Sequence, residues 1–236
     1  MQKEKWQLPE KGSEGVILPQ QLGRRKFLTY MGLAASVAGA SALMTSCNKD
    51  DDDDSSGVNL GSGDIGILNY AYALEQLEAA FYTQVIASQY TGITASELAL
   101  LTDIRDHEVA HREFFKAALA NNAIGSLQVD FSKVDFASRT SVLNTAKAFE
   151  DLGVAAYNGA GKLITTKAYL ELAGKIVSVE ARHAGYIRDL LSNGSFADNT
   201  VVDAQGLDLA KPPAEVLSTA SAFLKTKINA SNLPTS

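Results

Sequence analysis

The sequence predicts an all-α fold: an antiparallel four-helix bundle followed by a short C-terminal helix. Three observations support this prediction. From residue 64 onward, apolar residues recur with a helical period in four segments of more than 20 residues each. No alternating pattern typical of a strand extends beyond a few residues. The connection between the second and third segments, residues 123–138, is long enough to cross the length of a bundle.

The first two helices carry clear boundary signals. The first is expected over residues 64–90, with Asp64 as its N-cap and apolar residues at positions 68, 71, 74, 77, 81 and 85. The second is expected over residues 94–122. It opens with a capping box, in which the side chains of Thr94 and Glu97 each accept a hydrogen bond from the other residue's backbone amide.

Glycines mark the ends of the third and fourth helices. The third is expected over residues 138–164 and weakens at Gly159–Gly161. The fourth is expected over residues 166–194 and ends at Gly194, because glycine readily adopts the left-handed conformation that closes a helix.

The four helices place the bundle at residues 64–192. Residues 193–236 are then expected to form a loop and one short helix that packs on the bundle. That helix should start after Pro212–Pro213, because proline is well accommodated in the first turn of a helix.

Residues 1–46 are expected to be an export signal and not part of the fold. The pair Arg24 and Arg25 precedes an apolar, Gly/Ala-rich run of about fifteen residues, which is too short to span a bilayer comfortably. The string "RRKFL" resembles the signal of the twin-arginine export pathway. A generic secretory signal that happens to contain two arginines is the alternative.

Cys47 is the only cysteine in the chain, so it cannot form an internal disulfide. The small residues Thr45 and Ser46 directly before it resemble a bacterial lipobox, in which the cysteine becomes the lipidated first residue of the mature protein. A membrane anchor through this lipid is therefore expected. The alternative is an ordinary cleavage site near Cys47, which would release a soluble exported protein.

Residues 47–63 are expected to form an acidic, flexible tether, because their block of five aspartates repels itself. Such tracts resemble signals that send lipoproteins to the cell surface, although a plain spacer explains them equally well. We expect a lipid-anchored protein of the cell envelope, in the periplasm or at the outer-membrane surface. Removal of residues 1–46 leaves 15 basic and 24 acidic residues. This charge argues against a nucleic-acid partner.

Two copies of the pattern E-x-x-H lie in the second and fourth predicted helices. They are Glu108/His111 and Glu180/His183, and together with His107 they contain every histidine of the chain. Residues three apart lie on one face of a helix, so the carboxylate and the imidazole of each pair can bind the same metal ion.

An internal repeat relates the first and third predicted helices. "LEQLEAAFY", residues 74–82, aligns with "FEDLGVAAY", residues 149–157, so that Glu75 matches Glu150 and the two segments both end in tyrosine. In each half, the next helix carries the E-x-x-H pattern. Four carboxylates and two imidazoles would then converge inside the bundle, where buried carboxylates require cations to balance their charge.

This arrangement resembles the carboxylate-bridged di-metal site of the ferritin-like superfamily. The repeat segments are similar to bacterial ferritin-like domain proteins related to plant desiccation-associated proteins, over about residues 64–192. The resemblance implies two metal ions bridged by two carboxylates. The implied ligands are Glu108 and Glu180 as bridges, Glu75 with His111, and Glu150 with His183. Mixed oxygen and imidazole ligation suits iron or manganese, with zinc as a substitute, and we expect iron ahead of manganese.

Several neighbouring residues leave alternatives open. Glu78 lies one turn after Glu75 and could replace or supplement it, although the repeat favours Glu75 because Glu78 aligns with a glycine. Tyr82 and Tyr157 could hydrogen-bond a ligating carboxylate or could be ordinary core residues. His107 has no counterpart in the repeat, and we expect it at the surface or just outside the ligands.

The expected function is that of a di-iron or di-manganese oxidoreductase that protects the envelope against stress. Its chemistry would be that of a ferroxidase, a peroxidase or a catalase, with dioxygen or peroxide as oxidant and an unidentified reductant. A built-in FeS4 centre is excluded, because it needs four cysteines. The alternative is a non-catalytic structural or interaction protein that keeps a structural metal site. The sequence leaves open whether the chain forms a homodimer.

Overall fold

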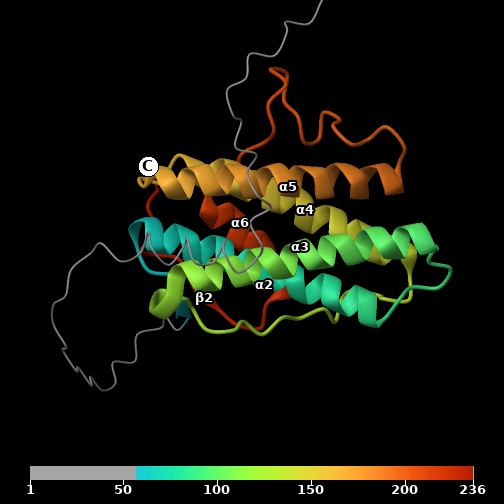
Figure 1. The fold of residues 1–236 in the computed structure, drawn as a ribbon, viewed down its shortest axis with the longest axis horizontal. Helices are drawn as coiled ribbons and strands as arrows, with labels where there is room; N and C mark the ends of the chain where they lie inside the picture. Colours follow the sequence, from blue (N-terminus) through green and yellow to red (C-terminus); the bar gives the residue numbers. More distant parts are fainter. Residues whose placement is uncertain (1–56, 236) are drawn as a thin grey trace, which may run out of the picture. The chain divides into compact units, whose positions relative to one another are not determined.

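The computed structural model describes residues 57–235. Its four long helices are α2 (Gly63–Ala87), α3 (Ala95–Leu119), α4 (Arg139–Gly161) and α5 (Lys167–Leu191). They form two closely packed pairs, α2 with α3 and α4 with α5, and α2 also contacts α4 (Figure 1). The predicted all-α bundle is confirmed, with helix ends shifted by a few residues from the expected positions.

The N-terminus of α2 differs from the expectation. Ser62 occupies the N-cap position, and Asp64 lies inside the first turn. The Asp64 carboxylate instead accepts hydrogen bonds from the backbone amides of Thr165 and Thr166, each at 2.8 Å. Asp64 therefore connects the start of α2 to the turn between α4 and α5. By contrast, the predicted capping box at the start of α3 is present.

Two polar side chains of α2 hold the long crossover, residues 123–138, against the α2–α3 pair. Asn69 donates to the backbone oxygen of Asn122 at 2.9 Å and accepts from the amide of Ile124 at 3.0 Å. Gln76 accepts from the amide of Leu127 at 2.9 Å. These bonds satisfy backbone groups of a segment that has little regular secondary structure, so the crossover has a defined path along the bundle (Figure 1).

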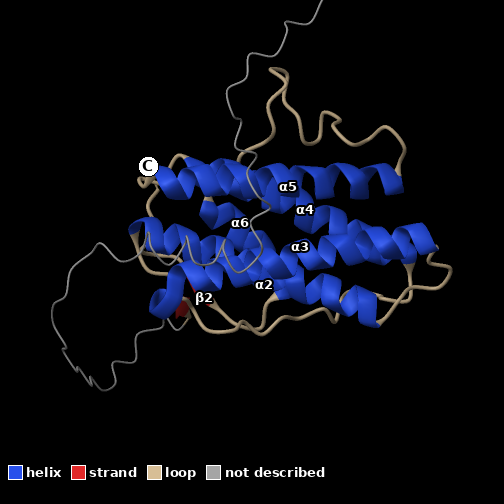
Figure 2. Cartoon of the chain, viewed as in Figure 1, coloured by secondary structure: helices blue, strands red, loops and turns tan. Residues whose placement is uncertain are grey.

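The segments that flank the bundle contain little β-structure (Figure 2). The two-residue strands β1 (Val58–Asn59) and β2 (Ile228–Asn229) pair in parallel. Leu60 follows β1 and is fully buried, so the folded part begins before the expected boundary at residue 64. The predicted export signal, Cys47 and residues 48–56 of the tether lie outside the described residues.

The C-terminal segment packs on α4. It contains α6 (Pro213–Ala220), which begins within the predicted Pro212–Pro213 pair. The amide of Lys211 donates to the backbone oxygen of Ala155 at 2.9 Å. One turn further along α4, a Cβ at Gly159 would lie 1.8 Å from the Lys211 backbone oxygen, so only glycine allows this close approach.

The apolar core extends from the helices into the crossover and the C-terminal segment. Phe81 of α2 is fully buried and makes edge-to-face ring contacts with Phe131 of the crossover and with Phe149 of α4. Phe149 makes a further edge-to-face contact with Phe223, which follows α6. Within residues 57–235, no helix is both long enough and apolar enough to cross a membrane.

Candidate metal centre

Acidic and imidazole side chains from all four long helices meet in the interior of the bundle. The side chains of the four glutamates are fully buried, and those of the two histidines are at most 13% exposed. Two overlapping groups could each hold a metal ion, because their ligand atoms lie within 4.8 Å of one another. One group is Glu75, Glu108, His111 and Glu180, and the other is Glu108, Glu150, Glu180 and His183. The structure thus brings together all six residues that the sequence analysis selected.

Glu108 and Glu180 belong to both groups, and each faces both histidines. Oε2 of Glu108 lies 3.6 Å from Nδ1 of His111, and its Oε1 lies 2.9 Å from Nδ1 of His183. Oε1 of Glu180 lies 3.0 Å from Nδ1 of His111, and its Oε2 lies 3.9 Å from Nδ1 of His183. Each of these two carboxylates thus has one oxygen near His111 and the other near His183. A carboxylate that bridges two ions must likewise present one oxygen to each ion.

Glu75 and Glu150 lie at the outer ends of this arrangement. Oε2 of Glu75 is 3.4 Å from Nδ1 of His111, and Oε2 of Glu150 is 3.4 Å from Nδ1 of His183. Each outer carboxylate therefore faces one histidine, whereas each shared carboxylate faces two.

Most ligand atoms of the cluster have no hydrogen-bond partner among the described residues. The atoms are Oε2 of Glu75, both oxygens of Glu108, Oε2 of Glu150, both oxygens of Glu180, and Nδ1 of His111 and of His183. Buried polar atoms without partners are costly, and here eight of them face one another. Oxygen and imidazole ligands in this number suit divalent cations such as iron, manganese or zinc. The residues present therefore fit the binding of a metal ion.

The pKa values show how much negative charge the cluster concentrates. Burial raises the pKa of Glu75 to about 7 and that of Glu180 well above its usual range, and repulsion by Glu108 adds to both. Burial alone would also raise the pKa of Glu108, but the two imidazoles lower it to about 2. Burial alone would lower the pKa of His183, yet its contacts with carboxylates raise it to about 10. Protons or cations must balance this charge.

Two tyrosines join the halves of the repeat by hydrogen bonds that cross between them. Tyr82 of α2 donates to Oε1 of Glu150 on α4 at 2.5 Å, and Tyr157 of α4 donates to Oε1 of Glu75 on α2. Each tyrosine thus binds the outer carboxylate of the other half. The bonds occupy the Oε1 atoms and leave the Oε2 atoms facing the histidines.

Glu78 is buried in the same region but belongs to neither metal-binding group. Its aligned residue in the repeat is Gly153. A Cβ at Gly153 would lie 3.2 Å from Oε1 of Glu78 and 3.5 Å from Oε2 of Glu180, so the glycine leaves space for both carboxylates. Burial and the neighbouring carboxylates, Glu180 foremost, raise the pKa of Glu78 well above its usual range.

His107 lies at the outer edge of the cluster. Its residue is exposed, and its Nδ1 is 2.9 Å from Nε2 of His183. This is the nitrogen of His183 that faces away from the carboxylates. His107 therefore contacts a candidate ligand and belongs to neither metal-binding group itself.

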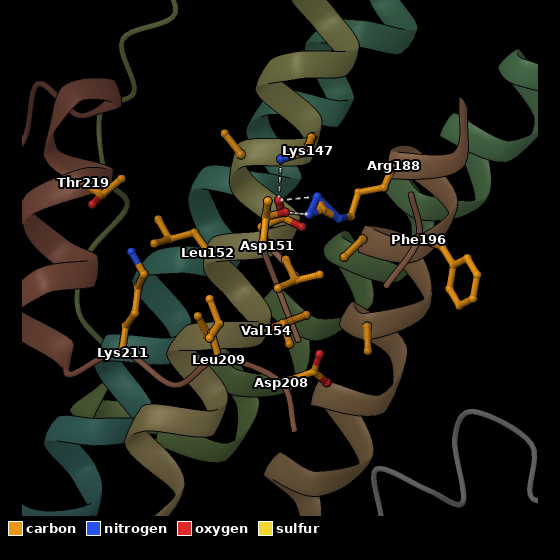
Figure 3. A pocket seen from close by; sticks show the side chains of 16 residues that line it. Lys147, Asp151, Leu152, Val154, Arg188, Phe196, Asp208, Leu209, Lys211 and Thr219 are labelled. Atoms are coloured by element: carbon orange, nitrogen blue, oxygen red, sulfur yellow. Dashed lines mark hydrogen bonds and ion pairs between the residues drawn. The ribbon is translucent and has the colours of Figure 1, made fainter. Parts of the chain in front are cut away.

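A separate cavity of about 290 Å³ lies beside α4 and α5 (Figure 3). Arg188 lines this cavity and is only 1% exposed. Its Nη1 lies 3.5 Å from Oδ2 of Asp151, and its Nη2 lies 3.1 Å from Oδ1 of Asp198. Asp151 also pairs with Lys147 at 2.9 Å. Sequence patterns did not reveal this ion-pair network, because its central contact joins Arg188 of α5 to Asp151 of α4, which are far apart in the chain. Asp151 directly follows Glu150 on α4, so the cavity and the acidic cluster adjoin different faces of that helix.

Comparisons with known proteins agree with this geometry. The model of a family described as "Ferritin-like domain" matches residues 63–193. The match covers more than half of the 236 residues and runs from the start of α2 to just beyond the end of α5. A comparison with curated proteins finds no match.

We expect the metal-free protein to lose thermal stability as the pH rises from 4.5 toward about 10. The folded pKa of Glu75, about 7, exceeds its ordinary value of 4.5, and that of His183, about 10, exceeds 6.5. Each group therefore contributes stability that is complete below its ordinary pKa and is lost as the pH rises through the folded value. Glu108, lowered to about 2, acts oppositely, but its contribution is lost only as the pH falls below 4.5. Thermal denaturation in the presence of a chelator measures this dependence.

The control for this prediction is Glu75→Gln, which removes one of the titrating groups. Its metal-free form should show a weaker loss of stability between pH 4.5 and about 7 than the unsubstituted chain. A midpoint of denaturation that increases over this range in the metal-free chain would contradict the assignment of raised pKa values to the cluster.

Proposed function

Because the chain belongs to the ferritin-like domain family, we propose that it is a di-metal oxidoreductase that reacts with peroxide or dioxygen. The observation that supports this most directly is the pair of shared carboxylates. Glu108 and Glu180 each present one oxygen to His111 and the other to His183. Two ions placed beside the two histidines would then be joined by both carboxylates.

Six residues would hold the ions. Glu108 and Glu180 would bridge them, Glu75 and His111 would complete one position, and Glu150 and His183 would complete the other. Iron is the proposed metal, ahead of manganese, and zinc is a redox-inactive substitute. Tyr82 and Tyr157 would orient the outer carboxylates, because each donates a hydrogen bond to the oxygen that faces away from a histidine.

Bound iron or manganese would supply one-electron and two-electron redox chemistry that protein side chains lack. Reduction of one peroxide molecule to two water molecules consumes two electrons and two protons, and an external reductant must restore the electrons. The chain's own contribution is the buried ligand set and the apolar core around it, which together restrict access of water. This combination supports peroxidase or ferroxidase chemistry.

A second candidate function is a non-catalytic protein with a structural metal site. The observation that favours it is the buried charge itself, since the five glutamates in the middle of the bundle need cations or protons whether or not a reaction occurs. The ligands would be the same in both cases, so turnover must be measured to distinguish them.

For the oxidoreductase, we expect the chain isolated with its own metal, once reduced, to consume hydrogen peroxide. Consumption should stop after about one peroxide per pair of metal ions unless a reductant is added, because each peroxide takes up two electrons. Metal analysis followed by peroxide measurement tests this. Zinc-loaded protein is the control, because zinc has no redox chemistry. A chain with two iron ions that leaves peroxide unchanged would support the structural alternative.

Substitution of a shared carboxylate should affect both ions. Glu180→Ala or Glu108→Ala should lower the metal content from about two ions per chain toward zero, whereas His111→Ala should mainly empty one position. Elemental analysis of the purified variants measures this. Glu171→Ala is the matched control, because Glu171 is exposed on the same helix as Glu180. Two ions retained by the double variant Glu108→Ala/Glu180→Ala would exclude the proposed site.

The same measurement distinguishes the two glutamates of α2. Glu75→Ala should reduce the metal content more than Glu78→Ala, because only Glu75 belongs to a metal-binding group. The reverse order would place the α2 ligand one turn further along the helix.

We also propose that the chain is exported through a twin-arginine-like signal and anchored by a lipid on Cys47. The small residues before this single cysteine support the proposal. Cys47→Ala should leave the membrane fraction and stop incorporating labelled fatty acid, because it lacks the thiol that is acylated. Ser46→Ala is the control and should retain the label. Unchanged membrane association of Cys47→Ala would refute the anchor.

A further inference from the structure

The imidazoles of His107 and His183 lie edge to edge in nearly one plane. Their rings are inclined by 7°, with centroids 5.1 Å apart, and the nearest nitrogens are 2.9 Å apart. Rings stacked face to face keep their atoms roughly 3.5 Å apart or more, so the 2.9 Å contact excludes a stack. In-plane contact is instead the geometry of an N–H···N hydrogen bond, because both the hydrogen and the lone pair of an imidazole lie in the ring plane.

The direction of this hydrogen bond follows from the candidate metal site. Nδ1 of His183 faces the carboxylates of Glu108 and Glu150. If this nitrogen binds a cation it carries no hydrogen, so the hydrogen of a neutral His183 lies on Nε2. Nε2 then donates to Nδ1 of His107. An acceptor at this place holds the ring in one orientation and makes its other nitrogen a stronger donor to a metal.

The repeat has no equivalent group in its other half. His107 directly precedes Glu108, and the residue that directly precedes Glu180 is Val179. Valine cannot accept a hydrogen bond, so α5 offers His111 no partner at the position where α3 offers His107 to His183. The two halves are thus alike in their six candidate ligands and different in this outer contact.

We propose that His107 is a positioning residue that makes the two metal positions unequal, with the His183 position binding its ion more tightly. This inference rests on the proposed di-metal site and adds an order to it. The His183–Glu150 position would fill first, and the His111–Glu75 position would fill second and lose its ion more readily.

The test is a titration of the full, metal-free chain with Co²⁺, whose visible absorption reports the ligands around each ion. We expect two binding steps in the unsubstituted chain. His107→Phe keeps a flat ring but removes the acceptor. It should weaken the tighter step, which we assign to the His183 position, by about 10-fold to 100-fold and leave the other step unchanged. In the His111→Ala background, where the His183 position is the intact one, the same substitution should weaken the remaining step.

Two further variants separate a positioning role from a structural one. His107→Gln restores an acceptor oxygen and should recover most of the lost affinity. Val179 is partly exposed, and Val179→His places an acceptor on α5 at the position equivalent to His107. This variant should strengthen the weaker step, which we assign to the His111 position. The metal-free His107 variants should keep the helical circular dichroism of the unsubstituted chain, so that a weakened step reports the lost contact with His183 and not an unfolded bundle.

Each outcome decides between the alternatives. If His107→Phe leaves both steps unchanged, or weakens both equally, His107 does not set the order of the two positions. If the unsubstituted chain binds Co²⁺ in two steps of equal affinity, the inference also fails, although the di-metal site survives. If that chain binds no Co²⁺, the proposed di-metal site itself fails.

Discussion

The constraint on which the structure depends is the burial of negative charge in the middle of a helical bundle. Five glutamates occupy positions in the core where they are at most 4% exposed. An ionised carboxylate in such surroundings is strongly destabilising unless cations, protons or hydrogen-bond donors balance it. The two histidines and the two tyrosines place nitrogen and hydroxyl groups beside this charge. The oxygens of Glu108 and Glu180 have no hydrogen-bond partner among the described residues and are available to a cation.

The bundle meets this constraint by joining its two helix pairs through polar contacts. Tyr82 and Tyr157 each reach across to the carboxylate of the opposite half, so neither pair of helices completes the site alone. Asp64 adds a polar contact at one end, where α2 meets the turn between α4 and α5. The separation between the halves is therefore set by directional hydrogen bonds as well as by apolar packing, and these keep the ligand atoms in place.

The departures from the repeat are informative about function. A fully symmetric site would give each position the same surroundings, yet Glu78 faces a glycine and His107 aligns with a valine. Gly153 lies beside Glu180, which belongs to both metal-binding groups. His107 contacts His183, which belongs to one of them. If ions bind there, such differences would change the charge near them or the orientation of one ligand, and would distinguish the proposed positions without altering the ligand set.

The sequence by itself determined the four helices, the capping box at Thr94 and the six residues that meet in the core. These features depend on the periodicity of single helices and on spacings of a few residues, which are local properties. Only the tertiary structure decided that each tyrosine binds the glutamate of the opposite half, that Asp64 contacts a distant turn, and that His107 contacts His183. Each of these depends on the relative rotation and axial position of helices far apart in the chain, which the packing of the whole bundle sets.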